Sequence, residues 1–218
     1  MKRTLVASAI TLLCASQVLA QTQGTNQPDT LQNQQTEQQQ TGASAQDAQL
    51  RTTFINASGQ EIGTATLNET PQGVLINLEV NGLPPGVHAF HIHETGVCDA
   101  QNGFESAGSH YAPGGSEHGY EASGGPHAGD LPNQYVSQDG VLKAEILSHM
   151  TTISEGDAPL LDNNGSALVI HSGADDYSSQ PSGDAGDRIA CAPVTQEQRQ
   201  AMRSGSQQGN TSPDALPQ

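Results

Sequence analysis

Apolar and polar residues alternate along several short stretches of the chain, with the period of two that marks a half-buried strand. The clearest run is Val74, Ile76, Leu78 and Val80. The same pattern predicts further strands at residues 50–56, 61–67, 87–93, 142–147 and 167–171. Turn signals such as Asp139-Gly140 separate these runs. Many short strands with Gly and Pro between them predict an all-β fold, an antiparallel sandwich or barrel.

Two long stretches lack any strand pattern. They cover residues 94–133 and 172–188. Loops of this length inside a compact domain are usually functional. We therefore expect two functional loops on the predicted sheet framework.

The beginning of the chain has the composition of a signal peptide, predicted over residues 1–20. Lys2 and Arg3 precede a short apolar run, and Val18-Leu19-Ala20 forms a small-residue cleavage site. The apolar run is too short to span a membrane. The sequence therefore predicts an exported protein, periplasmic or secreted, whose mature chain begins near Gln21.

The segments on either side of the predicted domain are poor in apolar residues. Residues 21–47 are rich in Gln and Thr, and residues 195–218 are rich in Gln, Ser and Gly. Such segments cannot bury enough surface to offset the entropy of ordering. We predict a disordered spacer, a folded domain at 48–194, and a disordered tail with a short helical turn around residues 196–203.

Charge and cysteine content narrow the function further. The formal net charge is -16 and 33% of the residues are hydrophobic, which disfavours nucleic acid as a partner. Signal cleavage removes Cys14 and leaves Cys98 and Cys191. An even count in an oxidising compartment favours a disulfide over a metal site. Two unpaired buried thiols are the alternative.

Histidines have the spacing of metal ligands. His91 and His93 share one face of a predicted strand, and His171 ends another. A loop series adds His110, His118, His127 and Asp130. This set is too large for one four-coordinate ion and suits two ions that share a ligand. The alternatives are an exposed histidine pair on the strand and a solvated loop rich in Gly and His.

Several of these motifs, in this order, resemble copper/zinc superoxide dismutases of the bacterial, exported type. The resemblance covers about residues 48–194. It is carried by Gly86-Val-His-Ala-Phe-His-Ile-His-Glu94, Ser106-Ala-Gly-Ser-His-Tyr-Ala-Pro113, Gly125-Pro-His-Ala-Gly-Asp-Leu131, Leu168-Val-Ile-His171 and Gly186-Asp-Arg-Ile-Ala-Cys191. It implies an eight-stranded, immunoglobulin-like Greek-key sandwich or barrel that holds copper and zinc.

The resemblance also implies a role for each site residue. Arg188 would guide the anionic substrate, Asp175 would hydrogen-bond the two histidines His91 and His118, and Cys98 and Cys191 would form the family disulfide. His88 would have no ligand role. The implied copper ligands are His91, His93, His110 and His171; the implied zinc ligands are His110, His118, His127 and Asp130, with His110 bridging.

The implied activity is the conversion of superoxide to oxygen and hydrogen peroxide by a Cu(II)/Cu(I) cycle, with zinc in a structural role. The substrate would be superoxide, and the chain a monomer or homodimer. A non-catalytic copper- or zinc-handling relative is the alternative, and a barrel that uses only zinc is a third possibility. The chain departs from many relatives in one respect: Lys143 is the only lysine left after signal cleavage. We therefore expect weak attraction of the anionic substrate, with Arg188 as the only local cation.

Overall fold

The computed structural model describes residues 49–208, with side chains for residues 49–202. The predicted signal peptide (1–20) and spacer (21–47) lie outside the described residues, as do residues 209–218 of the predicted tail. In the part of the chain that the structure describes, no helix is both long enough and apolar enough to cross a membrane.

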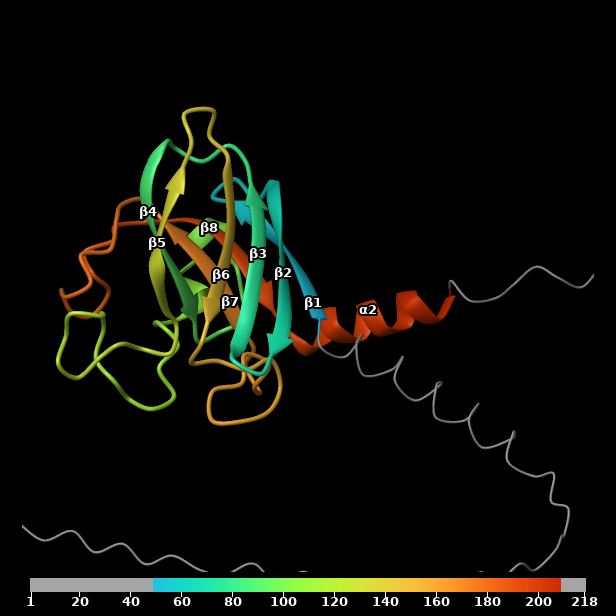
Figure 1. The fold of residues 1–218 in the computed structure, drawn as a ribbon. Helices are drawn as coiled ribbons and strands as arrows, with labels where there is room; N and C mark the ends of the chain where they lie inside the picture. Colours follow the sequence, from blue (N-terminus) through green and yellow to red (C-terminus); the bar gives the residue numbers. More distant parts are fainter. Residues whose placement is uncertain (1–48, 209–218) are drawn as a thin grey trace, which may run out of the picture. The chain divides into compact units, whose positions relative to one another are not determined.

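Eight antiparallel strands form one sheet, which confirms the predicted fold class (Figure 1). Neighbouring strands follow the order β5-β4-β7-β8-β1-β2-β3-β6. The strands are β1 (Gln49–Asn56), β2 (Glu61–Thr70), β3 (Gly73–Val80), β4 (Gly86–His93), β5 (Asp130–Val136), β6 (Leu142–Ser148), β7 (Ser166–His171) and β8 (Arg188–Val194).

The two edge strands of this sheet, β5 and β6, are consecutive in the chain. A tight turn joins them, in which Ser137 N donates to Val141 O at 3.0 Å and Gly140 N donates to Ser137 O at 2.9 Å. The turn brings the two ends of the sheet side by side, so the sheet curls into a nearly closed barrel (Figure 1). Closure protects most of the strand edges that would otherwise be exposed.

The main hydrophobic core fills the inside of the barrel. Its largest fully buried side chains include Phe54, Phe90, Ile92, Leu168 and Ile170. A second, smaller cluster lies on the outer face of β7 and β8, where Ala167, Val169 and Cys191 meet Phe104 and Ala107 of the first long loop. Every residue of β7 is therefore buried, because the barrel interior covers one face and the loops cover the other.

Two strands were missing from the prediction based on alternation. β5 has the sequence DLPNQYV, in which a proline and polar residues interrupt the apolar positions. β8 has the sequence RIACAPV, whose small residues give no contrast between its two faces. Because these strands begin at Asp130 and Arg188, the first long loop spans residues 94–129 and the second spans residues 172–187.

Part of the predicted disordered tail is helical, which corrects the prediction for these residues. Helix α2 spans Gln196–Gln208. Thr195 and Gln198 form a capping box: Thr195 N donates to Gln198 Oε1 at 2.9 Å, and Gln198 N donates to Thr195 Oγ1 at 3.5 Å. The predicted turn at residues 196–203 was thus the start of a longer helix.

Helix α2 lies against β1 (Figure 1). β1 pairs with β8 only at Ile55 and Asn56, which leaves the earlier part of that edge without a strand partner. There Arg51 N donates to Met202 Sδ at 3.1 Å, and Gln198 Nε2 donates to Thr52 Oγ1 at 3.2 Å. The helix therefore covers the strand edge that β8 leaves open.

Candidate metal centre

Four histidines come together on the outer face of the barrel. β4 provides His91 and His93, and β7 ends at His171. The first long loop adds His110 through a bridge between His93 and His110. All four side chains are buried, and each offers a ring nitrogen within 4.8 Å of the others. The structure therefore brings together the four residues that the sequence predicted to bind copper.

The hydrogen bonds on the far side of these rings set their tautomers. His93 Nδ1 donates to Gly108 O at 2.9 Å, and His171 Nδ1 donates to Gly186 O at 3.2 Å. Because a carbonyl oxygen can only accept, both Nδ1 atoms carry the proton and both Nε2 atoms present a lone pair. The two Nε2 atoms lie 3.4 Å apart. Two nitrogens on one ion at metal–imidazole distances of about 2.0–2.1 Å have a similar separation.

Two buried ring nitrogens in this group lack a hydrogen-bond partner. They are His91 Nδ1 and His110 Nε2. An unpaired polar atom in a buried position costs about 1–3 kcal/mol, so native proteins usually provide a partner. Both atoms belong to histidines of the four-histidine group, and the opposite nitrogen of each ring lies against a carboxylate. The residues present thus fit a metal ion at this point, with four nitrogen donors of the kind that copper accepts.

A second group surrounds the carboxylate of Asp130, the first residue of β5. Asp130 Oδ1 lies 2.9 Å from His110 Nδ1, 3.0 Å from His118 Nδ1 and 3.2 Å from His127 Nδ1. The other oxygen, Oδ2, accepts from the backbone N–H of Gly119 at 2.8 Å and of His127 at 3.0 Å. Three nitrogens and one oxygen within 4.8 Å of one another match the donor set of a tetrahedral zinc site.

His110 belongs to both groups. Its Nδ1 faces Asp130, and its Nε2 faces the four-histidine group. The ring centroids of His110 and His91 are 4.0 Å apart, which places the two groups side by side. A single imidazole therefore lies between them, as the predicted bridging role requires.

Asp175 connects the two groups on their other side. Its Oδ2 lies 2.8 Å from His91 Nε2, and its Oδ1 lies 3.0 Å from His118 Nε2. Each of these histidines therefore directs its opposite nitrogen into a metal group. Outer partners of this kind fix ring orientation and increase ligand basicity.

The ionisation states favour metal binding at neutral pH. Burial and the nearby His91 lower the pKa of His171 to about 3. Burial, only partly offset by the hydrogen bond to Asp130, lowers the pKa of His110 to about 4. Burial alone would raise the pKa of Asp130, but hydrogen bonds from His110 and Gly119 hold it well below its usual range. At neutral pH His171 and His110 are thus uncharged imidazoles and Asp130 is a carboxylate. The one ring proton of His110 would still have to leave for both of its nitrogens to bind metal.

A pocket of about 620 Å³ opens onto the four-histidine group. Arg188 is the only cationic residue among those that line it, which agrees with the sequence prediction. The guanidinium is held in place because Nη1 donates to Phe104 O at 2.6 Å and Nη2 donates to Gly108 O at 2.8 Å. Glu105 and Asp187 also line the pocket, and both are exposed.

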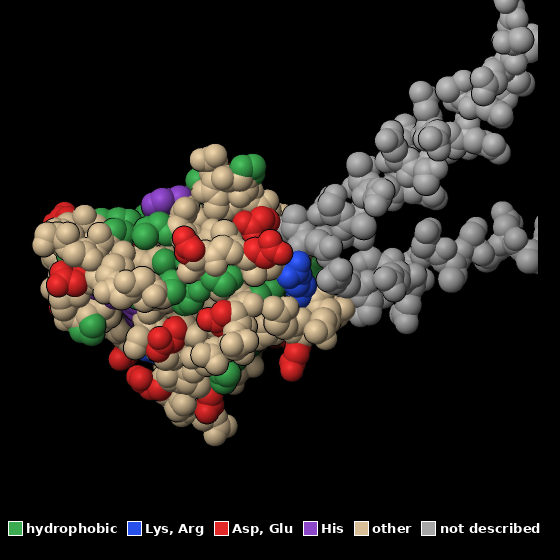
Figure 2. Space-filling model, turned by 90° about the horizontal axis from the view of Figure 1, so that it is seen from below, with side chains coloured by type: hydrophobic (Ala, Val, Ile, Leu, Met, Phe, Trp, Pro, Cys, Tyr) green, Lys and Arg blue, Asp and Glu red, His purple; other side chains and the backbone are tan. Residues whose placement is uncertain are grey.

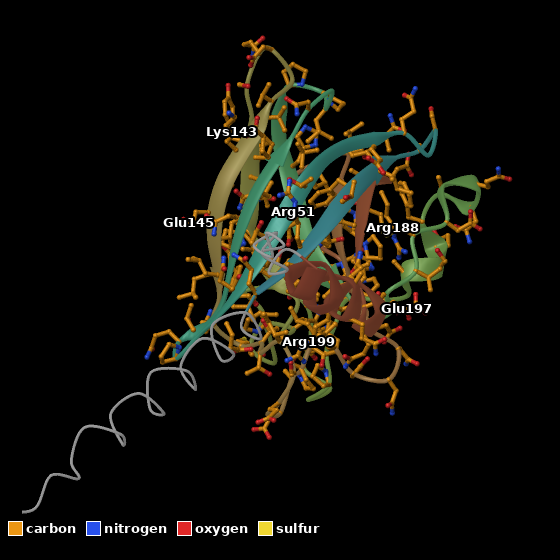
Figure 3. The ribbon with its side chains drawn as sticks, turned by 90° about the vertical axis from the view of Figure 1, so that its right-hand side faces the viewer. Arg51, Lys143, Glu145, Arg188, Glu197 and Arg199 are labelled. Atoms are coloured by element: carbon orange, nitrogen blue, oxygen red, sulfur yellow. A yellow bond between two sulfur atoms is a disulfide. The ribbon has the colours of Figure 1, made fainter. Side chains whose placement is uncertain are left out.

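The other Lys and Arg residues with described side chains, Arg51, Lys143 and Arg199, do not line the pocket. Figure 3 shows Lys143 on β6 and Arg199 on α2, both separated from Arg188. Lys143 Nζ is paired with Glu79 at 3.1 Å. Figure 2 shows Asp and Glu side chains spread over the face seen from below, with one prominent group of Lys and Arg atoms. Among the charged residues that line the pocket, two acidic side chains stand against the single cation Arg188.

The remaining predictions for single residues can be placed. Cys98 and Cys191 form a disulfide with a Cα–Cα distance of 5.7 Å. It links the first long loop to β8.

His88 is outside both metal groups: its Nδ1 lies 2.7 Å from His171 O and its Nε2 lies 2.8 Å from Pro84 O. The sequence reasoning missed Asn133 and Gln180, whose amides bond the backbone of site residues; neither shows a motif by which it could have been found.

Comparison with known proteins identifies the family. The model of the copper/zinc superoxide dismutase family matches residues 61–194. The chain belongs to the copper/zinc superoxide dismutase family. Superoxide dismutase [Cu-Zn] 2 of Aquifex aeolicus is 46% identical over 152 residues, which cover 69% of this chain and 88% of that protein. The Caulobacter vibrioides superoxide dismutase [Cu-Zn] is 41% identical, over 62% of this chain and 79% of its own.

Solved structures of superoxide dismutase relatives have the same fold. The crystal structure of a double mutant of a superoxide dismutase-like protein from Bacillus subtilis matches with a TM-score of 0.65 and 39% identity, covering 66% of this chain and 96% of its own. The Cu/Zn superoxide dismutase from Brucella abortus matches with a TM-score of 0.55 and 28% identity, covering 67% of this chain and 99% of its own. The family accounts for copper and zinc as the metals of this chain.

Proposed function

We propose that this chain dismutates superoxide with copper held by the four-histidine group and zinc held by the group around Asp130. The activity itself follows from family membership and from close relatives that are named Cu-Zn superoxide dismutases. The assignment of residues to metals is supported most directly by the two unpaired nitrogens, His91 Nδ1 and His110 Nε2. Copper would be held by His91, His93, His110 and His171; zinc would be held by His110, His118, His127 and Asp130.

The protein's own groups would position the substrate and supply protons. Copper, when bound, supplies a one-electron couple, while zinc supplies a fixed charge without redox chemistry. The Arg188 guanidinium lies in the pocket with its orientation fixed by two carbonyls, so its remaining N–H groups can bind a small anion. His110 Nε2 has one lone pair, so it would hold a proton for the product only while it is not bound to copper. In total, two superoxide anions and two protons give dioxygen and hydrogen peroxide.

Export is proposed as well. The disulfide Cys98–Cys191 suits an oxidising compartment, periplasmic or extracellular. The signal peptide at residues 1–20 remains a prediction from sequence. Monomer or homodimer also remains a prediction, which sedimentation of the purified mature chain would decide.

Metal content measured together with activity tests the assignment. We expect one copper and one zinc per chain and dismutase activity in the wild type. His93→Gln should lose copper and activity but keep zinc, whereas His127→Gln should lose zinc first. His149→Gln, a change in a histidine that belongs to neither metal group, is the matched control and should change nothing. A wild type that binds both metals without activity would favour the non-catalytic alternative.

A further inference from the structure

The two long loops are joined at the residues next to the metal groups. Glu121 N donates to Tyr177 O at 3.0 Å. Gly119 lies against the same carbonyl, because a Cβ at that position would be 2.0 Å from Tyr177 O. No larger residue fits there, so the close approach of the loops depends on this glycine.

The side-chain amide of Gln180 makes the most specific of these contacts. Its Oε1 accepts from His118 N at 2.9 Å, and its Nε2 donates to His118 O at 2.8 Å. The same Nε2 also lies 3.2 Å from Ser178 O. The amide thus satisfies both backbone groups of a zinc-group histidine, much as a paired strand would.

Gln180 lies in the segment 176–183, which is ordered by hydrogen bonds within the segment. Asp176 Oδ1 accepts from Ser178 N at 2.9 Å and from Ser179 N at 2.8 Å. Gly183 closes the segment, since its N donates to Ser179 O at 2.7 Å and its O accepts from Asp176 N at 2.9 Å. The exposed amide is therefore presented from an ordered turn, which reduces the entropy lost when it binds His118.

The carboxylate that joins the two metal groups is held in the same way. Asn133 Nδ2 donates to Asp175 O at 2.9 Å, and Asn133 Oδ1 accepts from Asp175 N at 2.8 Å. His118 and Asp175 are themselves bonded at 3.0 Å. Both members of this pair thus have their backbone fixed by a side-chain amide.

The residues that follow Gln180 form part of the substrate pocket. Pro181 and Ser182 line it together with His110 and Arg188. We propose that Gln180 is a positioning residue that ties the backbone of His118 to the pocket wall, so that zinc retention and the shape of the copper channel depend on each other. The proposal rests on the zinc assignment given under the proposed function.

The first test is the rate of zinc release from the copper- and zinc-loaded enzyme, followed with a zinc-binding dye. Loss of the two hydrogen bonds to the His118 backbone should make zinc release from Gln180→Ala about tenfold faster or more. Gln180→Glu, which keeps an acceptor for His118 N, should be intermediate. Gln134→Ala is the matched control, because its amide donates to Pro132 O and touches no metal-group residue. Release from Gln180→Ala at the control rate would overturn the proposal.

The second test separates positioning from general stability. Azide serves as the probe of the copper channel and is titrated against the copper protein with and without zinc. Gln180→Ala should change azide affinity about threefold with zinc present and have little effect without zinc, because the tie then has nothing to hold. An equal change in both states would overturn the proposal. A wild type that binds no zinc would instead contradict the proposed function.

Discussion

At the scale of single residues, the charge of the pocket depends on one cation with two acidic neighbours. Burial lowers the pKa of Arg188, while the nearby carboxylate of Glu105 raises it. The guanidinium also acts on His93 and His171, whose pKa values it helps to lower. The charge of Arg188 therefore interacts both with the histidine group and with the acidic side chain of Glu105.

We predict that Arg188→Ala lowers dismutase activity about tenfold or more without loss of copper. The reason is that a charge-assisted hydrogen bond to a small anion is worth about 1.5–3 kcal/mol. Activity and copper content of the same sample provide the measurement. Lys143→Ala is the control, because Lys143 pairs with Glu79 and does not line the pocket. Activity near the wild-type level in Arg188→Ala would rule out the role given to this residue.

Removal of a negative charge from the pocket should raise the dismutase rate. Glu105→Gln removes an exposed negative charge from the pocket and should raise the rate at low ionic strength, by about twofold. The gain should disappear in high salt, where exposed charges are screened. Glu145→Gln on β6, which Figure 3 shows far from Arg188, is the control. A gain that persists in high salt would point to a steric cause.

At the scale of elements, the helix that follows the last strand should contribute to the stability of the fold. Helix α2 covers the part of the β1 edge that β8 leaves unpaired. It also reaches the loop between β6 and β7, where Arg199 Nη1 donates to Ser154 Oγ at 2.5 Å and Gln196 Nε2 donates to Leu161 O at 2.9 Å. The helix lies outside the residues that the family model matches.

Deletion of residues 196–218 should lower stability by about 1–3 kcal/mol, because it exposes the β1 edge and removes several net hydrogen bonds. Urea unfolding of the metal-loaded protein measures the change. Deletion of residues 209–218 alone is the control and should have no effect. Equal stability of both deletions and the full chain would mean that α2 contributes nothing to the fold.

The elements also show what could be predicted from sequence. Strands with strong alternation were predicted to within a few residues, because Val, Ile and Leu on one face leave a clear signal. β5 and β8 were missed, because Pro132 in one and the alanines on either side of Cys191 in the other blur the two faces. The histidines were found because ring nitrogens at set spacing have few other uses. The amides of Asn133 and Gln180 carry no such signal, since their partners are backbone atoms distant in sequence.

At the scale of the whole molecule, the buried histidines link stability to pH. In the metal-free protein the pKa of His110 is lowered to about 4 and that of His171 to about 3, below the ordinary value of 6.5. At a pH between the ordinary value and these lowered values, the unfolded chain binds more protons than the folded chain does. The free energy of unfolding must therefore fall as the pH falls.

We predict that the metal-free protein loses stability from about pH 6.5 down to about pH 3. The depressed pKa values of Asp130 and Asp175 act with the same sign at the acidic end of this window. Urea unfolding at several pH values gives the slope. His171→Gln should flatten it, whereas His149→Gln should leave it unchanged. A stability that is constant from pH 6.5 to pH 4 would contradict the burial of neutral histidines.

The placement of the metal groups on the outside of the barrel affects which substitutions the site tolerates. One layer of backbone separates the histidines from the side chains inside the barrel, because neighbours along β4 and β7 face opposite ways. Interior residues such as Ile92 and Leu168 can thus exchange for others of similar volume while the ligands on the outer face keep their positions. Volume-conserving exchanges inside the barrel should therefore disturb the metal groups less than changes at the loop positions that carry ligands.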